Sequence, residues 1–213
     1  MKFYLVDRIL ELQVPKPSGL GGPAEPGRIV GVKNLSLAEE YLADHFPAYP
    51  VLPGVLMLES LVQAAAWLVR ASTDFEKSLI LLREARNVRY GSFVRPGSQL
   101  VMEVEASEIG REESRFKAVG RCEGQTAVQA QMVLEHLNVG DEDPGRSDLD
   151  ATLRDFWRER FRLIGGPQAM AAGRQAARPR GLSSPRASAG SPRGEAAGLP
   201  ASRRGRGPSQ GGS

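Results

Sequence analysis

Two side chains that could exchange protons with a substrate lie 14 residues apart, His45 and Glu59. Histidine and carboxyl groups are common general bases and general acids in enzymes. Three prolines at a spacing of three separate them: Pro47, Pro50 and Pro53. Because proline fixes φ and lacks a backbone N–H, this spacing predicts a stiff, extended loop that holds His45 near the start of the next helix. The pattern indicates acid–base catalysis, with His45 and Glu59 as the predicted catalytic residues.

The helix that follows the loop is predicted over residues 53–71. Pro53 suits the first turn of a helix, and Gly54 lets another group approach the backbone closely. The N–H groups at the start of a helix have no partner within it, so they can bind an oxygen atom. The sequence therefore places His45 near an end of a helix that could bind a substrate oxygen.

Glu59 is unusual because the predicted helix is apolar on nearly all sides. The other polar residues on the same helix face as Glu59 are Gln63 and Arg70. Burial of a carboxylate among aliphatic side chains costs free energy and raises its pKa, which suits a general acid near neutral pH. The alternative is that Glu59 pairs with an arginine in the core, and that His45 is a loop residue without a catalytic role. The proline and glycine scaffold between the two residues favours the catalytic interpretation.

The composition argues against several other classes of site. A single cysteine, Cys122, excludes internal disulfides and a zinc site built from cysteines. The two histidines, His45 and His136, are too few for a multi-histidine centre, so no metal is expected. The 28 basic and 25 acidic residues give a net charge of +3, yet residues 165–213 carry eight arginines and one glutamate. The preceding residues are therefore net negative, which argues against nucleic acid as a partner.

The most apolar segment, residues 51–69, is long enough to span a membrane but contains a proline, a glycine, a glutamate and a glutamine. A carboxylate near the centre of a bilayer costs several kcal/mol. The segment therefore predicts a helix buried in a protein core, with no membrane span. Charged residues within the first 12 positions also interrupt any signal peptide, and a cytoplasmic location is expected.

Hydrophobic periodicity and turn residues predict an α+β domain over residues 1–138. Its predicted strands cover residues 4–14, 28–35, 78–89, 99–109, 114–122 and 126–137. A loop rich in Pro and Gly at residues 15–27 and a short helix at residues 37–44 precede the long helix. A long buried helix followed by an antiparallel meander differs from the alternating pattern of a parallel nucleotide-binding sheet.

Three further segments follow this domain. They are an acidic linker at residues 139–146, an amphipathic helix at residues 147–164 and a tail at residues 165–213. Gly, Pro, Ser and Ala make up 34 of the 49 tail residues, eight arginines supply its charge, and no aromatic residue is present. Such a composition cannot build a core, so the tail is predicted to be disordered.

The segment HFPAYPVLPGVLMLESLVQAA, residues 45–65, resembles the active-site segment of the FabA/FabZ 3-hydroxyacyl-[acyl-carrier-protein] dehydratases. The likeness is closest to the FabZ type. That family's pattern is His-Phe-Pro-x-x-Pro-x-x-Pro-Gly-Val, with a Glu on the following helix and a Gln one turn later, and every position is filled here. The resemblance covers residues 3–138. It departs at Ala48, where the family commonly has Gly, and in the longer loop at residues 15–27.

The resemblance implies a hot-dog fold, in which an antiparallel sheet wraps a long central helix, and a homodimer or an assembly of dimers. It implies a 3-hydroxyacyl thioester on acyl carrier protein as the substrate and a trans-2-enoyl product, formed without a cofactor. His45 would remove the proton next to the thioester carbonyl, while Glu59 from the partner chain would help the hydroxyl leave as water. The helix start at Gly54 would polarise the carbonyl, and Gln63 would support the Glu59 carboxyl. The other predicted substrate-binding residues are Phe46, Pro53 and Val55.

Two other functions fit the same fold. A hot-dog acyl-thioester hydrolase could also carry a carboxylate on the central helix, but it would not need the His-Phe-Pro loop. A non-catalytic subunit would bind the acyl carrier without chemistry. An acidic carrier protein needs a basic docking surface, and the sequence offers one in a single stretch: Arg83, Arg86, Arg89 and Arg95. The alternative for these arginines is a solvated strand face.

Overall fold

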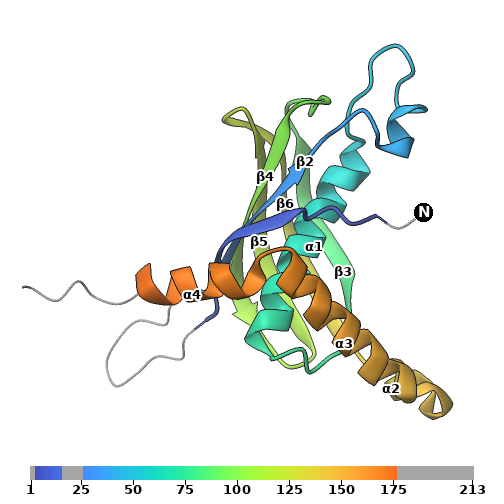
Figure 1. Cartoon of the computed structure of the whole chain (residues 1–213), viewed down its shortest axis with the longest axis vertical. Helices are drawn as coiled ribbons and strands as arrows, with labels where there is room; N and C mark the ends of the chain where they lie inside the picture. The colour runs from blue at the N-terminus through green and yellow to red at the C-terminus, as the bar shows by residue number, and fades with distance from the viewer. Residues whose placement is uncertain (1–2, 16–25, 177–213) are drawn as a thin grey trace, which may run out of the picture. The chain divides into compact units, whose positions relative to one another are not determined.

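The fold is built on one six-stranded antiparallel sheet that curves around a helix (Figure 1). The computed structural model describes residues 3–15 and 26–176. Across the sheet the strands follow the order β1-β2-β4-β5-β6-β3, and all neighbours are antiparallel. The strands are β1 (Arg8–Gln13), β2 (Arg28–Asn34), β3 (Leu79–Tyr90), β4 (Gln99–Ile109), β5 (Glu113–Cys122) and β6 (Gln125–Leu137). Helix α1 (Gly54–Ser72) lies against one face of the sheet.

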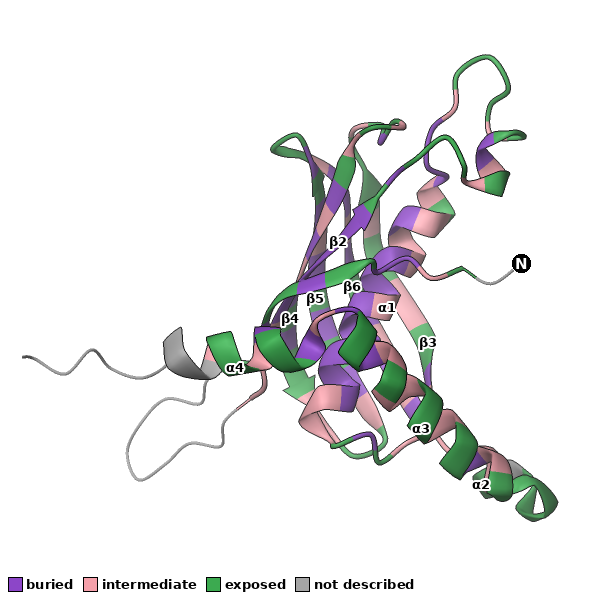
Figure 2. Ribbon diagram, viewed as in Figure 1, coloured by how far each residue is buried: buried purple, intermediate pink, exposed green. Residues whose placement is uncertain are grey.

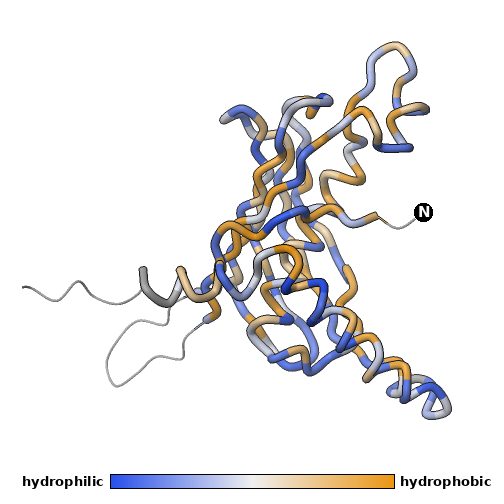
Figure 3. The backbone as a smooth tube through the Cα atoms, viewed as in Figure 1, coloured by the Kyte–Doolittle hydropathy of each residue, from blue (hydrophilic) through white to orange (hydrophobic). Residues whose placement is uncertain are grey.

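The alternation of apolar and polar residues explains how the sheet meets the helix. On β5, Phe116, Ala118 and Cys122 are buried, whereas Lys117 and Arg121 between them are exposed. Successive side chains of a strand point to opposite faces, so this alternation gives β5 one apolar face and one polar face. Figure 3 shows the same alternation of hydrophobic and hydrophilic residues along the strands.

Helix α1 is the centre of the core (Figure 2). Leu61, Ala64, Ala65, Leu68 and Val69 are all 0% exposed. By length and composition α1 could cross a membrane, but 61% of its most apolar window is buried inside the fold. An antiparallel sheet wrapped around a long central helix is the hot-dog arrangement, and it confirms the predicted fold class.

Two N-terminal elements are shorter than predicted. β1 occupies only part of the strand predicted over residues 4–14. The helix predicted over residues 37–44 is a single 3₁₀ turn, η1 (Glu40–Leu42), in which Leu42 alone is buried. A segment with one buried side chain lacks the packed face that stabilises a longer helix in water.

Residues 139–146, predicted to be an acidic linker, are instead folded. They form helix α2 (Val139–Glu142) and a second 3₁₀ turn, η2 (Pro144–Arg146). The reason is the buried side chain of Asp150, whose carboxylate accepts hydrogen bonds from the first two N–H groups of α2 at 2.7 and 2.9 Å. These N–H groups would otherwise lack a partner.

Two longer helices complete the described chain. Helix α3 (Asp148–Leu163) lies where the periodicity predicts an amphipathic helix over residues 147–164. Helix α4 (Gly166–Ala176) lies in the region from Gly165 onward that is predicted to be disordered. The prediction of disorder is therefore wrong for these first residues of the tail.

Helix α4 forms because its own residues favour a helix and because it packs against the sheet. Pro167 fits the first turn of a helix, and the alanines that follow favour helix. Ala169 is buried, and the helix packs against β1. Gly173 allows this close approach, since a Cβ there would stand only 2.3 Å from the Leu12 carbonyl oxygen. The rest of the predicted tail, from residue 177, and residues 16–25 of the predicted loop lie outside the described residues.

Candidate active site

The loop that carries His45 is closed by contacts with its own backbone. The N–H of Val51 donates to the His45 carbonyl oxygen at 3.1 Å, and His45 Nδ1 lies 3.2 Å from the Val51 carbonyl oxygen. The N–H of Leu52 donates to the carbonyl oxygen of Val94 at 2.9 Å. The loop is therefore tied at its base to the segment that follows β3.

The contact with Val51 decides which nitrogen of His45 is basic. A carbonyl oxygen can only accept a hydrogen bond, so Nδ1 carries the proton when the ring is neutral. Nε2 is then the nitrogen with a free lone pair. The ring is half-buried, and Phe46 stacks on it with ring centroids 4.2 Å apart. These contacts hold the His45 ring in place and leave Nε2 free to accept a proton.

The start of α1 presents free backbone donors. The carbonyl oxygen of Pro53 accepts hydrogen bonds from the N–H groups of Leu56 at 2.9 Å and Met57 at 3.0 Å. No side chain in the described part of the chain caps this helix. The N–H groups of Gly54 and Val55 therefore have no acceptor within the helix, and they can bind a carbonyl oxygen or an oxyanion.

Gly54 lies directly against the ring of Tyr90, at the end of β3. A Cβ built on Gly54 would stand 3.1 Å from Tyr90 Cε1, which is closer than most side-chain contacts. Glycine thus lets β3 approach the helix start without a clash. Sequence reasoning missed Tyr90 as a neighbour of the site, because the two residues are far apart in the chain and no local spacing reveals the contact.

Glu59 is held by Gln63, one turn further along α1. Gln63 Nε2 donates to Glu59 Oε1 at 2.9 Å and to the Phe3 carbonyl oxygen at 2.9 Å. Gln63 Oε1 accepts the N–H of Leu5 at 2.9 Å. Gln63 therefore joins the Glu59 carboxylate to the N-terminal segment. Glu59 itself is only partly buried, although the apolar helix predicts full burial, because it faces a cavity and not the sheet.

This cavity has a volume of about 150 Å³ and lies between α1, the N-terminal segment and α3. Glu59 and Gln63 line it, but His45 does not. At a rise of about 1.5 Å per residue, the Glu59 backbone lies about 8 Å from the start of α1. The single chain thus joins Glu59 to Gln63, and places His45 in the loop that leads to Gly54. It does not bring His45 into the cavity of Glu59.

Arg70 offers no support for the alternative in which Glu59 pairs with an arginine in the core. Its guanidinium stacks on the rings of Trp157 and Trp67, 4.3 and 5.4 Å from their centroids. Burial lowers the pKa of Arg70 to about 9, so the side chain is still charged at neutral pH. Among the described residues Arg70 forms no ion pair, and the hydrogen-bond partner of the Glu59 carboxylate is Gln63.

The family model of the FabA-like domain matches residues 1–136. The chain belongs to the FabA-like family. Among its curated relatives, the 3-hydroxyacyl-[acyl-carrier-protein] dehydratase FabZ of Bacillus pumilus is 35% identical over 132 residues, which cover 62% of this chain and 84% of the relative. The FabZ of Aromatoleum aromaticum is 35% identical over 133 residues, covering 61% and 84%.

A solved structure, the dehydratase heterocomplex ApeI:P from Xenorhabdus doucetiae, is 16% identical to this chain, with a TM-score of 0.49 over 64% of this chain and 84% of the other. The family assignment depends on the sequence matches. The FabA-like domain ends before α3, so the walls that α3 contributes to the Glu59 cavity lie outside it.

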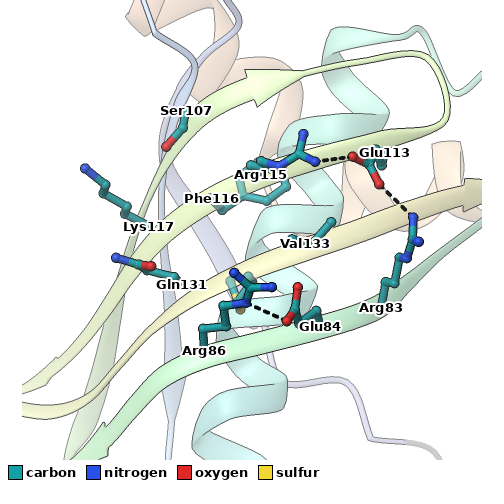
Figure 4. A pocket seen from close by; sticks show the side chains of 11 residues that line it. Arg83, Glu84, Arg86, Ser107, Glu113, Arg115, Phe116, Lys117, Gln131 and Val133 are labelled. Carbon is teal, nitrogen blue, oxygen red and sulfur yellow. Dashed lines mark hydrogen bonds and ion pairs between the residues drawn. The ribbon is translucent and has the colours of Figure 1, made fainter.

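A larger hollow, of about 620 Å³, lies on the face of the FabA-like sheet that points away from α1 (Figure 4). Most of its charged side chains pair with one another. Arg83 bonds to Glu113 at 2.8 Å and Arg86 to Glu84 at 2.5 Å, and Arg115 also pairs with Glu113. Neither His45 nor Glu59 lines this hollow, so it is separate from the two predicted catalytic residues.

Proposed function

We propose that the protein dehydrates 3-hydroxyacyl thioesters carried on acyl carrier protein, and releases trans-2-enoyl thioesters. The proposal depends on one observation above all. His45, with a basic Nε2, and Glu59, bonded to Gln63, stand in the loop and helix of a FabA-like domain. Relatives at 35% identity are named 3-hydroxyacyl-[acyl-carrier-protein] dehydratases.

The proposed reaction is an elimination of water. His45 Nε2 removes the proton from the carbon next to the thioester carbonyl, and the N–H groups of Gly54 and Val55 stabilise the negative charge that develops on the carbonyl oxygen. The electron pair forms the double bond as the bond between C3 and its hydroxyl breaks. The Glu59 carboxyl donates its proton to this hydroxyl, which leaves as water. Each step moves only protons and electron pairs of the substrate, the histidine and the carboxyl group.

Phe46 and Pro53 complete the predicted substrate contacts. Phe46 is 53% exposed beside the His45 ring, where it could cover the reacting part of the thioester. Pro53 orients the helix start from the N-cap position. We assign Gln63 a positioning role, because its hydrogen bond to Oε1 fixes the orientation of the Glu59 carboxyl.

The proposed site is shared between two chains, with His45 of one facing Glu59 of the other. The cavity beside Glu59 lacks His45, so the pair is incomplete within one chain. Large apolar side chains are exposed around the His45 loop: Phe46, Tyr49, Val55, Tyr90 and Phe93. Strand β3 also forms an edge of the sheet, with Leu81 and Leu82 exposed. An open edge and an apolar patch favour pairing with a second copy of the chain, in a homodimer or an assembly of dimers.

The four arginines predicted to dock the carrier protein fall into two groups. Arg83 and Arg86 pair with carboxylates in the hollow on the outer face of the sheet. Arg89 and Arg95 are exposed and, within the described part of the chain, form no ion pair. Arg95 lies over the Tyr49 ring, 5.5 Å from its centroid, and so places a cation beside the His45 loop. We propose that Arg89 and Arg95 contact the acidic carrier protein. A cytoplasmic location remains part of this proposal.

Product analysis with a 3-hydroxyacyl-carrier protein tests the reaction. We expect the wild type to form the enoyl thioester without release of free carrier thiol. The variant His45→Ala should form the enoyl thioester far more slowly than the wild type, also without release of free thiol. Release of free thiol from the wild type would instead identify an acyl-thioester hydrolase. Binding of the acyl carrier with no product would identify a non-catalytic subunit.

A further inference from the structure

Helix α3 follows the residues that the FabA-like family model matches, and it packs on α1 through aromatic side chains. Trp157 meets Trp67 edge to face, with ring centroids 5.6 Å apart, and Phe161 lies 5.9 Å from the same ring. The guanidinium of Arg160 lies 3.9 Å from the centroid of the Tyr4 ring. α3 is thus fixed both to the central helix and to the N-terminal segment.

The cavity that includes Glu59 runs between these elements. On α1 it is lined by a stripe that begins at Glu59 and ends at Arg70, which spans about 16 Å along the helix axis. Trp157 and Arg160 line it from α3. Because Trp157 stacks on Arg70, it stands at the end of the cavity that lies furthest from Glu59. A chain that extends from the reacting carbons along this stripe would meet the Trp157 ring.

The Trp157 ring is held firmly at this position. It packs against both Trp67 and the Arg70 guanidinium, and Arg70 is only 5% exposed. Among the described residues, neither Arg70 Nε nor Trp157 Nε1 has a hydrogen-bond partner. Stacking of a desolvated cation on indole rings is favourable by itself. Arg70 therefore acts as a positioning residue, which keeps Trp157 across the cavity.

We infer that α3 forms the closed end of the acyl pocket and that Trp157 limits the length of the acyl chain. The inference rests on the proposed function, since it takes Glu59 as the point where the acyl chain reacts. The cavity runs along the stripe of α1 from Glu59 to Arg70, so the distance from Glu59 to the Trp157 ring sets how many methylenes it admits. Each methylene that finds apolar space strengthens binding about fourfold, and each that meets the indole ring loses this gain.

The test compares Trp157→Ala with the control Leu163→Ala, an apolar truncation on the same helix at a residue that is 71% exposed and does not line the cavity. Two quantities are measured over a series of acyl-chain lengths. They are kcat/KM with 3-hydroxyacyl-carrier proteins, and the Kd of acyl-pantetheine amides, which cannot be turned over. For Trp157→Ala we expect both optima to move to chains at least two methylenes longer, with a gain above tenfold for the longer chain relative to the shorter. Leu163→Ala should keep the wild-type profile.

An unchanged profile in folded Trp157→Ala protein would overturn the inference, as would a wild type whose Kd does not depend on chain length. If Trp157→Ala does not fold, Trp157→Phe keeps a ring and should shift both profiles in the same direction by a smaller amount, and its failure to do so would overturn the inference. The Kd series separates this inference from the proposed reaction. A shifted Kd profile in a protein that forms no enoyl product would refute the dehydration and retain the role of Trp157.

Discussion

The two ends of α1 differ in what covers them. At its start, Val55 is 71% exposed, the helix has no side-chain cap among the described residues, and the His45 loop has apolar side chains on its surface. At its end, Arg70 and Phe75 are buried under the aromatic side chains of α3. The chain closes the far end of the helix by itself and leaves the start open. In the proposed function, a site at the open end is completed by groups from outside the chain, namely a substrate and a second subunit.

The two edges of the sheet differ in the same way, because one is covered by other segments and the other is open. On β1, the N–H of Ile9 donates to the carbonyl oxygen of Ile164 at 2.8 Å, and α4 packs alongside. On β3, at the other edge, Leu81 and Leu82 are exposed. Covered edges cannot pair with another chain, whereas an open edge can. If the chain assembles as proposed, we expect the contact to form at β3, because the C-terminal helices cover β1.

Loss of either proposed acid–base group should have the largest effect. His45→Ala and Glu59→Ala should each lower kcat by about two to four orders of magnitude, because a general acid or base typically contributes this much. Thermal unfolding should change little, since both side chains are only partly buried. The control Glu105→Ala removes an exposed carboxylate on β4 and should keep wild-type turnover. Near-normal turnover in either site variant would contradict the assignment of that residue.

A methyl group at the open end of α1 should have the next largest effect. In Gly54→Ala the new Cβ would stand 3.1 Å from Tyr90 Cε1, so the ring or the helix start must move. We expect kcat/KM to fall about tenfold, because displaced N–H groups at the helix start would stabilise the oxyanion less well. In the double variant Gly54→Ala/Tyr90→Ala the loss should be smaller than the two single losses together. Full additivity would show that the Tyr90 contact is not the cause.

Changes at the closed end should affect stability and not turnover. Burial alone would raise the pKa of Asp150, but hydrogen bonds from Ser78 and from the N–H groups of Gly140 and Val139 outweigh it and hold the pKa below its usual value. A lowered folded-state pKa stabilises the protein above the unfolded pKa of about 3.9, and this stabilisation disappears as the pH falls below it. At pH 7 Asp150→Asn should unfold roughly 3 to 6 °C below the wild type.

This gap in thermal midpoint should narrow when the pH is taken from 5 to below the unfolded pKa of about 3.9. The control Asp155→Asn changes an exposed carboxylate on the same helix and should give no comparable gap at any pH. Turnover per folded molecule should stay within about twofold of the wild-type value in both variants, because neither residue belongs to the proposed site. A gap for Asp150→Asn that persists unchanged in acid would contradict the proposed role of its carboxylate.

Charge reversal at the carrier surface should have the smallest effect. Arg95→Glu should raise KM for the carrier-linked substrate several-fold at low salt, and the effect should fade at high salt because exposed charges are screened. Turnover of an acyl-pantetheine substrate, which lacks the carrier, should not change. Arg86→Glu is the matched control, because Arg86 already pairs with Glu84. Equal KM changes for both variants would remove Arg95 from the docking surface.

The parts of the fold that depend on local pattern could be predicted from the sequence. The apolar residues that follow Pro53 predict a helix over residues 53–71, and α1 spans Gly54–Ser72. The turn between β5 and β6 follows from Gly124, which adopts a φ of 77°. The short extent of η1 and the presence of α4 were harder to predict, because both depend partly on contacts with distant segments. Ala169 is helical only where β1 supplies the surface that it packs on.

In the candidate site too, contacts within one helix could be predicted from the sequence, whereas contacts between distant segments could not. The hydrogen bond between Glu59 and Gln63 follows from their separation of four residues on one helix. The contact of Gly54 with Tyr90, and that of Arg70 with Trp157, join segments that only the folded chain brings together. No periodicity in the sequence contains this information.

The shared site is the central claim, and mixing two inactive variants tests it most directly. His45→Ala and Glu59→Ala protein are combined under conditions in which subunits exchange, and exchange is verified with labelled chains. Random reassortment makes about half of the dimers mixed, and each mixed dimer has one site with both groups and one with neither. We predict that activity returns to about a quarter of the wild-type value. If exchange is complete and no activity returns, His45 and Glu59 act within one chain and the shared site is wrong.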